Sequence, residues 1–452
     1  MATREFDLLI DGATVLTMDA DGTVVSDGVI GVAGGAITLI EKRIPNIHYS
    51  AAEIIDGRGM LAFPGFVNTH AHCFQSLLKG LGADMSLIEW LNRSVQPFGV
   101  SVTHRQQKLA TLLTCLESLK SGCTTLCEFF YTNQDPELAD VCIETMRSTG
   151  IRTVLMRTFQ DYDEEYNTPS CYIEPVDKAI GEIERLRRRY LPDNLLSIWT
   201  GPDVTWATSR RGYEAILEYC LDQDVCYTMH LKETPEDDAM CLRHYGCGIV
   251  DLLDEIGFLT DRFLAVHCVH LTQREVELLA ERGVSVSHNP AANLYLGSGI
   301  APISALIDAG ANVCLGTDGA ASNNTTDIID SMRLAALIQK GVHRDATAMS
   351  ARDVVTMATS GGAKALRMND VIGSLEVGKR ADIVLFNPDK LRSTPMHDSL
   401  ATLVYSSSAE NIDTTIVDGN VVYRKGVFSC GIDESQIARL VRDELQRMGV
   451  TV

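Results

Sequence analysis

Histidine and acidic residues recur directly after short apolar segments of the chain, in a pattern that suits a metal ion. The first such segment runs into His70 and His72, and side chains two residues apart on an extended strand share one face. Further residues of this kind follow later apolar segments, namely His230, Glu233, His267, His288 and Asp318. Imidazole nitrogens with one carboxylate oxygen form a ligand set that suits Zn²⁺ and also accommodates Fe²⁺, Mn²⁺ or Ni²⁺. The pattern therefore predicts a site for a divalent metal ion.

Each of these motifs has an ordinary structural explanation when it is taken alone. An H-x-H pair in a strand is often incidental, and the segment around Asp318 has the composition of a simple turn. His267 could be a hydrogen-bonded histidine of the core, and His270 competes with it for a functional role. His270 lies beyond the apolar segment, which favours a loop, so we select His267. The joint pattern carries the prediction, because unrelated residues would not all fall at the same end of successive strands.

The middle of the chain, residues 61–372, has the alternating pattern of a parallel sheet with covering helices. Apolar segments of strand length occur at 61–67, 123–129, 151–157, 195–201, 225–230, 263–269, 283–288 and 312–317. Amphipathic stretches of helical length lie between them, among them 104–120, 173–190, 209–222 and 272–282. This number of strands predicts an α/β fold, a (β/α)8 barrel of the TIM type, in which functional residues gather at the carboxyl ends of the strands. A doubly wound sheet is the alternative.

The two ends of the chain resemble each other more than they resemble the middle. Within the terminal segments 1–60 and 373–452, residues 6–40 and 373–425 alternate short apolar segments with turns, as antiparallel strands do. Asp11-Gly12 and Asp418-Gly419 are each predicted to form a hairpin turn. Neither end alone has enough strands to bury an apolar face, so we expect one small β-sandwich built from both termini, followed by a C-terminal helix. Two independent β extensions are the alternative.

The composition restricts the partners and the compartment. The 452-residue chain is 45% hydrophobic and 22% charged, as in a globular protein that buries a sizeable core. Its 60 acidic and 39 basic side chains give a formal net charge of −21, which disfavours binding to nucleic acid or anionic membranes. We see neither a secretory leader nor an apolar segment of about 20 residues, so we expect a cytoplasmic protein without membrane spans. The 13 cysteines form no C-x-x-C motif and are expected to be free thiols.

Six segments, taken together and in their order, closely resemble the amidohydrolase superfamily. They are PGFVNTHAH, HLKET, AVHCVHLT, VSHNPAANLYLGSGIAPI, LGTDGAASNN and GSLEVGKRADIVLF. The resemblance covers nearly the whole chain and is narrowest to the branch that holds S-adenosylhomocysteine/methylthioadenosine deaminases, guanine-type deaminases and s-triazine hydrolases. It implies a metal-dependent hydrolase with a barrel and a composite β-sandwich, assembled as a homodimer or a higher homo-oligomer.

The resemblance also implies a role for each residue of the predicted site. It makes His70, His72, His230 and Asp318 the metal ligands. Glu233 becomes the acid and base that moves protons to a substrate nitrogen, and His267 polarises the attacking water or the substrate. The metal would lower the pKa of water to about 7, and Asp318 would accept the proton that this water loses. Members with two metals use a lysine on the fourth strand, which residues 195–201 lack, so one ion per subunit is expected, Zn²⁺ before Fe²⁺.

The positions expected to contact the substrate match the triazine hydrolases at some residues and differ from the adenosine-type deaminases at others. Gln75 and Trp90 match the triazine hydrolases, in which this glutamine lines the pocket. The adenosine-type deaminases carry a glutamate in a Pro-x-Glu context that holds ribose hydroxyls, where this chain has Gln96-Pro97-Phe98-Gly99. They also place a histidine on the loop after the fourth strand, where this chain has Asp203. The chlorine-displacing hydrolases carry a polar residue at the position of Gly319, so loss of an amine is expected rather than loss of chloride.

Acidic residues follow the second, third and fourth strands and predict an acidic pocket. Glu128, Asp161 and Asp203 stand at these positions, although Asp161 could instead cap a helix and Glu128 could pair with Arg157. An acidic pocket would select a cationic or amino-rich substrate. We therefore expect hydrolytic removal of ammonia or an amine from a C=N carbon of a small amidine, guanidine, biguanide or aminoheterocycle such as an s-triazine. The expected substrate-binding residues are Gln75, Trp90, Glu128, Arg157, Asp203 and His288.

Three alternative functions remain open at this point. The first is an adenosine-type deaminase that acts on S-adenosylhomocysteine or methylthioadenosine, which needs another residue in place of the missing glutamate. The second is an s-triazine chlorohydrolase. The third is a catalytically silent metal-binding or scaffold protein of the same fold, in which a Glu233→Gln substitution would have no effect.

Overall fold

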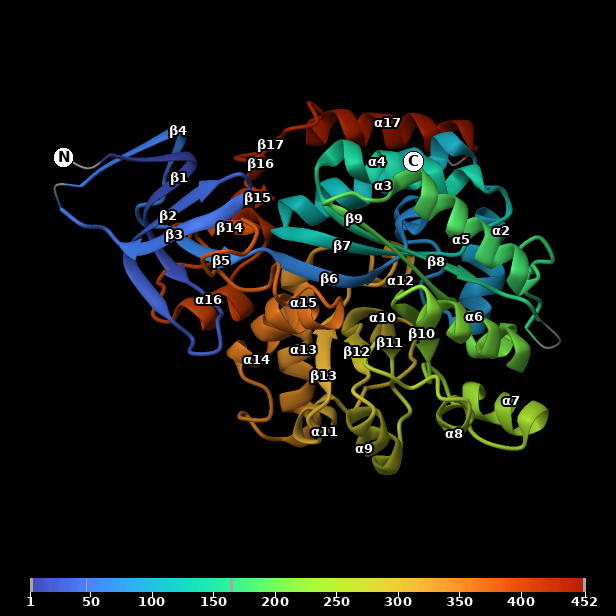
Figure 1. The fold of residues 1–452 in the computed structure, drawn as a ribbon. Helices are drawn as coiled ribbons and strands as arrows, with labels where there is room; N and C mark the ends of the chain where they lie inside the picture. Colours follow the sequence, from blue (N-terminus) through green and yellow to red (C-terminus); the bar gives the residue numbers. More distant parts are fainter. Residues whose placement is uncertain (1–2, 46, 163–165, 450–452) are drawn as a thin grey trace.

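The central part of the chain forms a barrel of eight parallel strands. The computed structural model describes residues 3–45, 47–162 and 166–449. The barrel strands are β6 (Phe66–Ala71), β7 (Cys123–Phe130), β8 (Arg152–Phe159), β9 (Leu196–Pro202), β10 (Tyr227–Leu231), β11 (Phe263–His267), β12 (Ser285–His288) and β13 (Asn312–Leu315). They lie side by side in the order of the sequence (Figure 1). A doubly wound sheet reverses its strand order at one point, so that alternative is wrong.

Hydrogen bonds join the last strand of the barrel to the first. The backbone N–H of Asp318 donates to the carbonyl oxygen of His70 over 2.9 Å. The hydroxyl of Thr69 donates to the carbonyl oxygen of Leu315 over 2.9 Å. The ends of β6 and β13 therefore meet, and the residues that follow them face the same end of the barrel.

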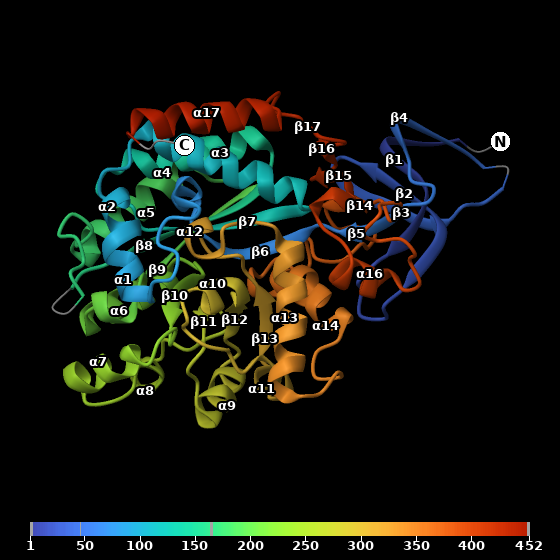
Figure 2. The ribbon, with the colours of Figure 1, turned by 180° about the vertical axis from the view of Figure 1, so that it is seen from behind.

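Helices cover the outside of the barrel. The four stretches named from the sequence are α3 (His104–Lys120), α5 (Val176–Tyr190), α6 (Arg210–Asp222) and α9 (Gln273–Glu281), and Figures 1 and 2 show them outside the strands. The other α-helices between residues 66 and 365 are α1 (Leu87–Trp90), α2 (Gln96–Gly99), α4 (Glu137–Thr149), α7 (Glu236–Tyr245), α8 (Ile249–Glu255), α10 (Pro290–Tyr295), α11 (Ile303–Asp308), α12 (Ala320–Asn323), α13 (Ile328–His343), α14 (Ala351–Thr356) and α15 (Gly362–Ala365). Every residue of β7 and β8 is buried, as expected for strands covered on both faces.

Strands from both ends of the chain form a second sheet, which makes the small β-sandwich domain. Its strands are β1 (Thr3–Leu16), β2 (Val24–Ala33), β3 (Ala36–Lys42), β4 (His48–Asp56), β5 (Leu61–Pro64), β14 (Ile383–Phe386), β15 (Ile412–Val417), β16 (Asn420–Arg424) and β17 (Val427–Phe428), with α16 (Ser399–Tyr405) between β14 and β15. Strand β5 joins the two contributions, because it pairs with β1 on one side and with β14 on the other. The prediction of one domain built from both termini is confirmed.

The strand predicted over residues 61–67 is wrong as a single strand. Residues Leu61–Pro64 form β5 in the terminal sheet, and the barrel begins with β6 at Phe66. Gly65 lies between them, where a Cβ atom would stand 2.1 Å from Thr124 Oγ1. The chain therefore changes sheets at a residue that has no room for a side chain. The domain limits 1–60, 61–372 and 373–452 stay predictions.

The two Asp-Gly pairs have different structures. Asp418-Gly419 is the turn between β15 and β16, and both residues have positive φ, as a tight hairpin requires. Asp11-Gly12 lies inside β1, where the register with β2 shifts and Gly12 has a φ of 87°. The hairpin predicted there is wrong, because the glycine supplies a bulge that bends a long strand instead of ending it.

A buried ion pair connects the barrel to the terminal domain. The guanidinium of Arg152 on β8 donates to both carboxylate oxygens of Asp382, over 3.0 and 2.9 Å, and both side chains are buried. Such two-point pairing fixes orientation as well as distance. The helix α17 (Glu434–Arg447) packs beside α3, where Arg105 Nε lies 2.6 Å from Glu444 Oε2 (Figure 1). This helix therefore contacts the barrel.

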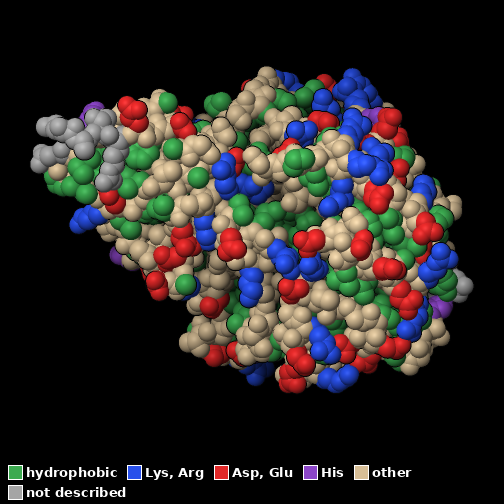
Figure 3. All heavy atoms as spheres, in the orientation of Figure 1, with side chains coloured by type: hydrophobic (Ala, Val, Ile, Leu, Met, Phe, Trp, Pro, Cys, Tyr) green, Lys and Arg blue, Asp and Glu red, His purple; other side chains and the backbone are tan. Residues whose placement is uncertain are grey.

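The surface and the thiols agree with the composition. Acidic and basic side chains are interspersed on the face that Figure 3 shows. Within the described ranges, no helix has the length and apolarity that a bilayer crossing requires. All 13 cysteines are free thiols and most are buried, which confirms the expectation from their spacing.

Candidate active site

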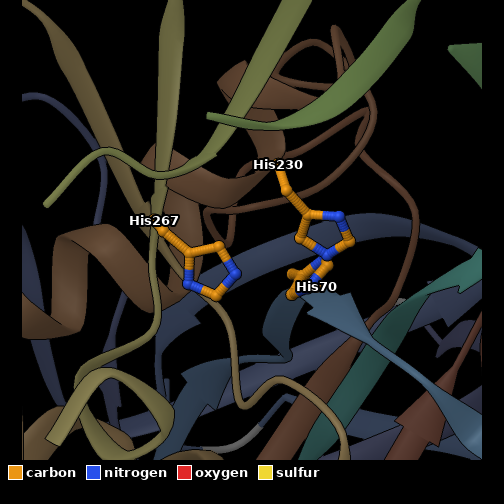
Figure 4. A group of neighbouring side chains, drawn as sticks. All are labelled: His70, His230 and His267. Atoms are coloured by element: carbon orange, nitrogen blue, oxygen red, sulfur yellow. The ribbon is translucent and has the colours of Figure 1, made fainter. Parts of the chain in front are cut away.

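Five predicted site residues converge at one end of the barrel. His70 and His72 come from the end of β6, His230 from β10 and His267 from β11, while Asp318 follows β13. Asp318 Oδ1 lies 3.5 Å from His70 Nε2 and 3.4 Å from His72 Nε2. The ring centroids of His70 and His230 are 5.0 Å apart, and Figure 4 shows these rings and that of His267 directed toward one another. The structure thus gathers in space the residues that the strand-end pattern selected.

Hydrogen bonds fix how two of the histidine rings are turned. Nδ1 of His72 lies 2.8 Å from the carbonyl oxygen of Phe129, and Nδ1 of His230 lies 2.9 Å from that of Asp203. Since a carbonyl oxygen only accepts, both Nδ1 atoms carry the proton and both Nε2 atoms present a lone pair. These Nε2 atoms are 3.4 Å apart, and neither ring nitrogen of His70 has a hydrogen-bond partner among the described residues. Converging lone pairs without a donor between them fit a bound cation.

The protonation states of His70, His72 and Asp318 also suit a metal ion. Burial lowers the pKa of His70 to about 4 and holds the pKa of His72 well below its ordinary value. Burial opposes ionisation of Asp318, but the nearby imidazoles, that of His70 foremost, hold the pKa of this carboxyl below its usual range. Neutral imidazoles and an ionised carboxylate are the forms that coordinate metals. His70, His230 and His267 also bring one ring nitrogen each within 4.8 Å of one another, so His267 is near enough to join the ligand set.

Glu233 lies beside this cluster and contacts His267. Its Oε2 is 3.5 Å from His267 Nε2, and the hydroxyl of Ser298 donates to its Oε1 over 3.1 Å. Asn293 Oδ1 holds Nδ1 of His267 at 2.8 Å, which directs Nε2 toward the carboxylates of Glu233 and Asp318. His267 and Asp318 have φ values of 74° and 62°, which are unfavourable for residues with side chains. Strained backbone of this kind concentrates at functional sites.

A cavity opens in front of the cluster. The predicted residues that line it are His72, Gln75, Trp90, Asp203, His230, Glu233, His267 and Asp318. The other lining residues are Leu87, Leu91, Gln96, Tyr131, Gln160, Thr168, Tyr172, Val204, Trp206 and Leu296. Three carboxylates belong to this lining, and within the described part of the chain no lysine or arginine does. The cavity is therefore acidic, with an aromatic and aliphatic wall.

Asp203 serves both the cluster and the cavity. Its Oδ1 lies 3.2 Å from Nδ1 of His230, and its Oδ2 accepts a hydrogen bond from Nε2 of Gln160. Burial opposes protonation of His230, but the hydrogen bond to Asp203 raises the pKa of this histidine above its ordinary value. Asp203 therefore orients a predicted ligand and remains part of the cavity wall.

Gly319 makes room for Gln75 beside the cluster. A Cβ atom at residue 319 would stand 1.9 Å from Gln75 Oε1. The Gln75 amide donates from Nε2 to the hydroxyl of Tyr131 over 3.1 Å, and its buried Oε1 has no partner among the described residues. A side chain at residue 319 would therefore require the Gln75 amide to move.

Glu128 does not line the cavity, so its predicted role in substrate binding is wrong. Successive residues of β7 alternate between the two faces, and Phe129 is the one that faces the cluster, with its ring centroid 4.1 Å from that of His230. Glu128 faces outward, where its Oε2 accepts a hydrogen bond from the backbone N–H of Cys73 over 2.7 Å. Burial raises the pKa of Glu128 to about 8.

Three further predicted residues lie away from the cavity lining. Arg157 lies outside the cavity lining and pairs with the buried carboxylate of Glu174, so the alternative pairing with Glu128 is wrong. His288 is buried outside the lining, and burial together with the nearby His267 lowers its pKa to about 3. Asp161 accepts hydrogen bonds from the backbone N–H and the hydroxyl of Ser209 at the start of α6, which is the helix-capping alternative.

The cavity also contains residues that the sequence did not mark. Tyr131 follows β7 and Gln160 follows β8, so the rule that selected the histidines could have found them. Tyr172 lies in the segment before α5, and Gln96 lies on the short helix α2. Their presence depends on how long loops fold back over the barrel, for which the sequence offers no periodic signal.

The barrel and its strand-end cluster define the class of the protein, a hydrolase that uses a bound divalent metal. Residues 61–422 match the model of the amidohydrolase family, and the chain belongs to this family. A 5-methylthioadenosine/S-adenosylhomocysteine deaminase of Syntrophobacter fumaroxidans is 33% identical over 437 residues, which cover 96% of this chain and 97% of the relative.

Solved structures agree with this placement. An adenosine deaminase from Xanthomonas campestris with bound zinc has a TM-score of 0.92 at 29% identity, over 100% of both chains. An atrazine chlorohydrolase from Arthrobacter aurescens in complex with zinc has a TM-score of 0.90 at 27% identity, over 96% of this chain and 99% of the other. The resemblance stated from the sequence is confirmed. The chain is a metal-dependent aminohydrolase that acts on carbon–nitrogen bonds.

Proposed function

We propose that this aminohydrolase removes ammonia or a small amine from an amino-rich heterocycle, amidine or guanidine by adding water to the C=N carbon. The cavity lining carries the proposal, because Asp203 and Glu233 line it beside the proposed metal ligands, and no lysine or arginine does among the described lining residues. Carboxylate and amide oxygens accept hydrogen bonds from amino groups. Such a wall favours substrates rich in N–H groups over anions.

The proposed metal ligands are His70, His72, His230 and Asp318, with one ion per subunit. When bound, the ion supplies Lewis acidity and lowers the pKa of water toward neutrality. Zinc is proposed because both solved structures described above contain it, and because nitrogen donors with one carboxylate suit it. Fe²⁺ suits the same donors and is the alternative.

Asp318 and Glu233 divide the proposed proton transfers. Asp318 is ionised and receives the proton that the attacking water loses. Glu233 is proposed to stay off the metal and, in its protonated form, to protonate the nitrogen of the C=N bond as the oxygen adds. The proton held by Asp318 then passes to the amino group, which leaves as a neutral amine, and the added hydroxyl returns its proton to Glu233. His267, held by Asn293 at 2.8 Å, hydrogen-bonds to the attacking oxygen or to the substrate. Asp203 is a positioning residue, since it acts through His230 and Gln160.

Ammonia release by the purified enzyme, with its metal content measured, tests the proposal. The panel contains guanidines, biguanides, aminotriazines, guanine and methylthioadenosine. We expect turnover of the small amino-rich compounds and little turnover of methylthioadenosine. Efficient turnover of methylthioadenosine alone would contradict the proposal.

Adenosine-type deamination is the second candidate. The names of the Syntrophobacter relative and of the Xanthomonas structure favour it. Gly99, where the deaminases described above carry a glutamate, disfavours a ribose contact at that position. A third candidate, dechlorination of a triazine, rests on the similarity to the Arthrobacter structure, and Gly319 disfavours it. Chloride release from a chlorotriazine separates it from deamination.

We further propose that the enzyme is a cytoplasmic homo-oligomer. The formal net charge of −21 disfavours polyanionic partners, so the proposed partners are small molecules and further copies of the chain. Sedimentation at several protein concentrations measures the assembly, and a monomer at micromolar concentration would contradict this part of the proposal.

A further inference from the structure

One wall of the cavity consists of two segments that the proposed proton transfers do not use. Gln160 directly follows β8, and Tyr172 precedes α5. A backbone bridge joins Gln160 to Ile173, and the N–H of Glu174 donates to the carbonyl oxygen of Gln160 over 2.8 Å. Both side chains line the cavity, with 7% and 2% of their surface exposed. Two buried polar side chains thus lie on neighbouring segments of one wall.

The hydroxyl of Tyr172 occupies space that Gly99 leaves free. A Cβ atom at residue 99 would stand 2.2 Å from this oxygen, whereas the next atoms, Phe74 Cε2 and Tyr172 Cζ, would be 3.5 Å away. Only the hydroxyl therefore excludes a side chain from position 99. The oxygen is buried, and no residue in the described ranges forms a hydrogen bond with it. A buried hydroxyl without a partner is unfavourable, so its retention in a cavity wall indicates that a ligand satisfies it.

Gln160 supplies the complementary group. Its Nε2 donates to the carboxylate of Asp203, which fixes the orientation of the amide. Its Oε1 is an acceptor, is buried, and has no partner among the described residues. Burial raises the pKa of Tyr172 well above its ordinary value, so this hydroxyl keeps its proton and can donate. The wall therefore offers one acceptor and one donor.

We propose that Gln160 and Tyr172 bind one edge of the substrate ring, with Gln160 accepting from an N–H group and Tyr172 donating to a ring nitrogen or a carbonyl oxygen. This rests on the proposed function, because it concerns the same cavity. It narrows the substrate class to planar aminoheterocycles that present an N–H and an acceptor on one edge. A guanidinium ion has no acceptor to offer Tyr172, so it gains less from this wall.

A double-mutant cycle tests the proposal. Tyr172→Phe removes the hydroxyl and keeps the ring, and we expect the KM of a heterocyclic substrate to rise about 10-fold while kcat stays within about twofold. Gly99→Ala forces the hydroxyl away and should have a similar effect. In the Tyr172→Phe background the added methyl group meets its nearest neighbours at 3.5 Å, so Gly99→Ala should then change little. A purely structural role would couple the two substitutions in stability, because they share one steric contact, and would give no selective change in KM.

Tyr405→Phe is the matched control. Tyr405 also has a buried hydroxyl oxygen without a partner in the described part of the chain, and it does not line the cavity. Its loss should leave the KM of every substrate unchanged. The KM of a guanidine substrate should respond to none of the three substitutions.

Two readouts separate this inference from the proposed function. Fluorescence of Trp90 and Trp206, which line the cavity, reports ligand binding to the Glu233→Gln variant without turnover. Wild-type turnover of heterocycles with an unchanged KM in Tyr172→Phe and Gly99→Ala would overturn the inference alone. If the heterocycles bind, Tyr172→Phe weakens this binding, and the wild type does not turn them over, the proposed function is wrong and the proposed contacts of Gln160 and Tyr172 are supported. Neither binding nor turnover of the heterocycles would overturn both.

Discussion

Asp318 and Glu128 are buried carboxylates on opposite faces of the same barrel, and their surroundings give them opposite charge states. Asp318 is 3.4 to 3.5 Å from two imidazoles on the inner face, and its pKa lies below the usual range. Glu128 lies among the thiols of Cys73 and Cys142 on the outer face, and burial raises its pKa to about 8. Burial alone therefore does not determine the charge. The donors around each carboxylate do.

This contrast assigns catalysis to the inner face of the barrel strands and packing to their outer face. The inner face collects charged and metal-binding groups, while the outer face accepts a carboxyl group as a neutral acid. The same substitution, carboxylate to amide, should accordingly abolish activity on the inner face and leave it intact on the outer face. The predictions below test this difference in order of decreasing effect.

Asp318→Asn should have the largest effect. The amide neither accepts the proton of the attacking water nor balances the charge of a metal ion, so kcat/KM should fall at least about 1,000-fold, and metal content should fall with it. Ammonia release and metal analysis on the same preparation measure both. Retention of full activity with full metal content would contradict the assignment.

Removal of the metal should abolish activity reversibly. Dialysis against a chelator should lower turnover more than about 100-fold, and Zn²⁺ should restore it. The apo protein should also unfold at a lower temperature, because a ligand that binds only the native state stabilises it. Restoration by Fe²⁺ and not by Zn²⁺ would replace the proposed metal while leaving the inner-face assignment intact.

Asp203→Asn should have an intermediate effect. The change weakens the interaction that orients His230 and the hydrogen bond from Gln160, and losses at such supporting positions are about 10- to 100-fold in activity or metal affinity. The KM of an amino-rich substrate and the metal dissociation constant distinguish the two causes. An unchanged KM and an unchanged metal affinity would remove Asp203 from the site.

Glu128→Gln should have the smallest effect on activity, within about twofold, and a distinct effect on stability. The folded pKa of about 8 exceeds the ordinary value of 4.5, so between these pH values the folded state keeps a proton that the unfolded state has lost. Wild-type stability attributable to this group therefore decreases as the pH rises from about 4.5 to about 8. The neutral amide removes this loss, so the variant should gain stability relative to the wild type over that window, by about 5 kcal/mol at most.

Denaturant unfolding at pH 5 and at pH 8 measures this gain. A stability difference between variant and wild type that is the same at both pH values would show that Glu128 is not protonated in the folded state. A loss of activity beyond about 10-fold in Glu128→Gln would show that the outer face participates in the chemistry. The contrast drawn between Asp318 and Glu128 would then be wrong.

The sequence predicted the inner face well because its rule is geometric. Strand ends of a barrel converge, so His70, His230 and Asp318 could be placed together without knowledge of any loop. The same rule gave the number of barrel strands and the domain built from both termini. It failed at residues 61–67, because an apolar run does not reveal that the chain leaves one sheet and enters another at Gly65.

Glu128 was misplaced because its strand is covered on both faces. All eight residues of β7 are buried, so no polar alternation marks which residues face inward. Tyr172 was missed for a different reason, since its position depends on the folding of a segment between a strand and a helix. The match between Gly99 and the Tyr172 hydroxyl joins two segments distant in the sequence, and a pattern read along one segment cannot contain it.

The strand order of the terminal sheet has a consequence for synthesis of the protein. Strand β5 needs β14 as its neighbour, and the whole barrel lies between them in the sequence. While the ribosome makes the barrel, the N-terminal strands are exposed with one hydrogen-bonding edge open, and such edges pair readily with other chains. Nascent chains should therefore need protection until β14 emerges. A circular permutant in which β14–β17 directly precede β1 would complete the sheet early and reduce that need.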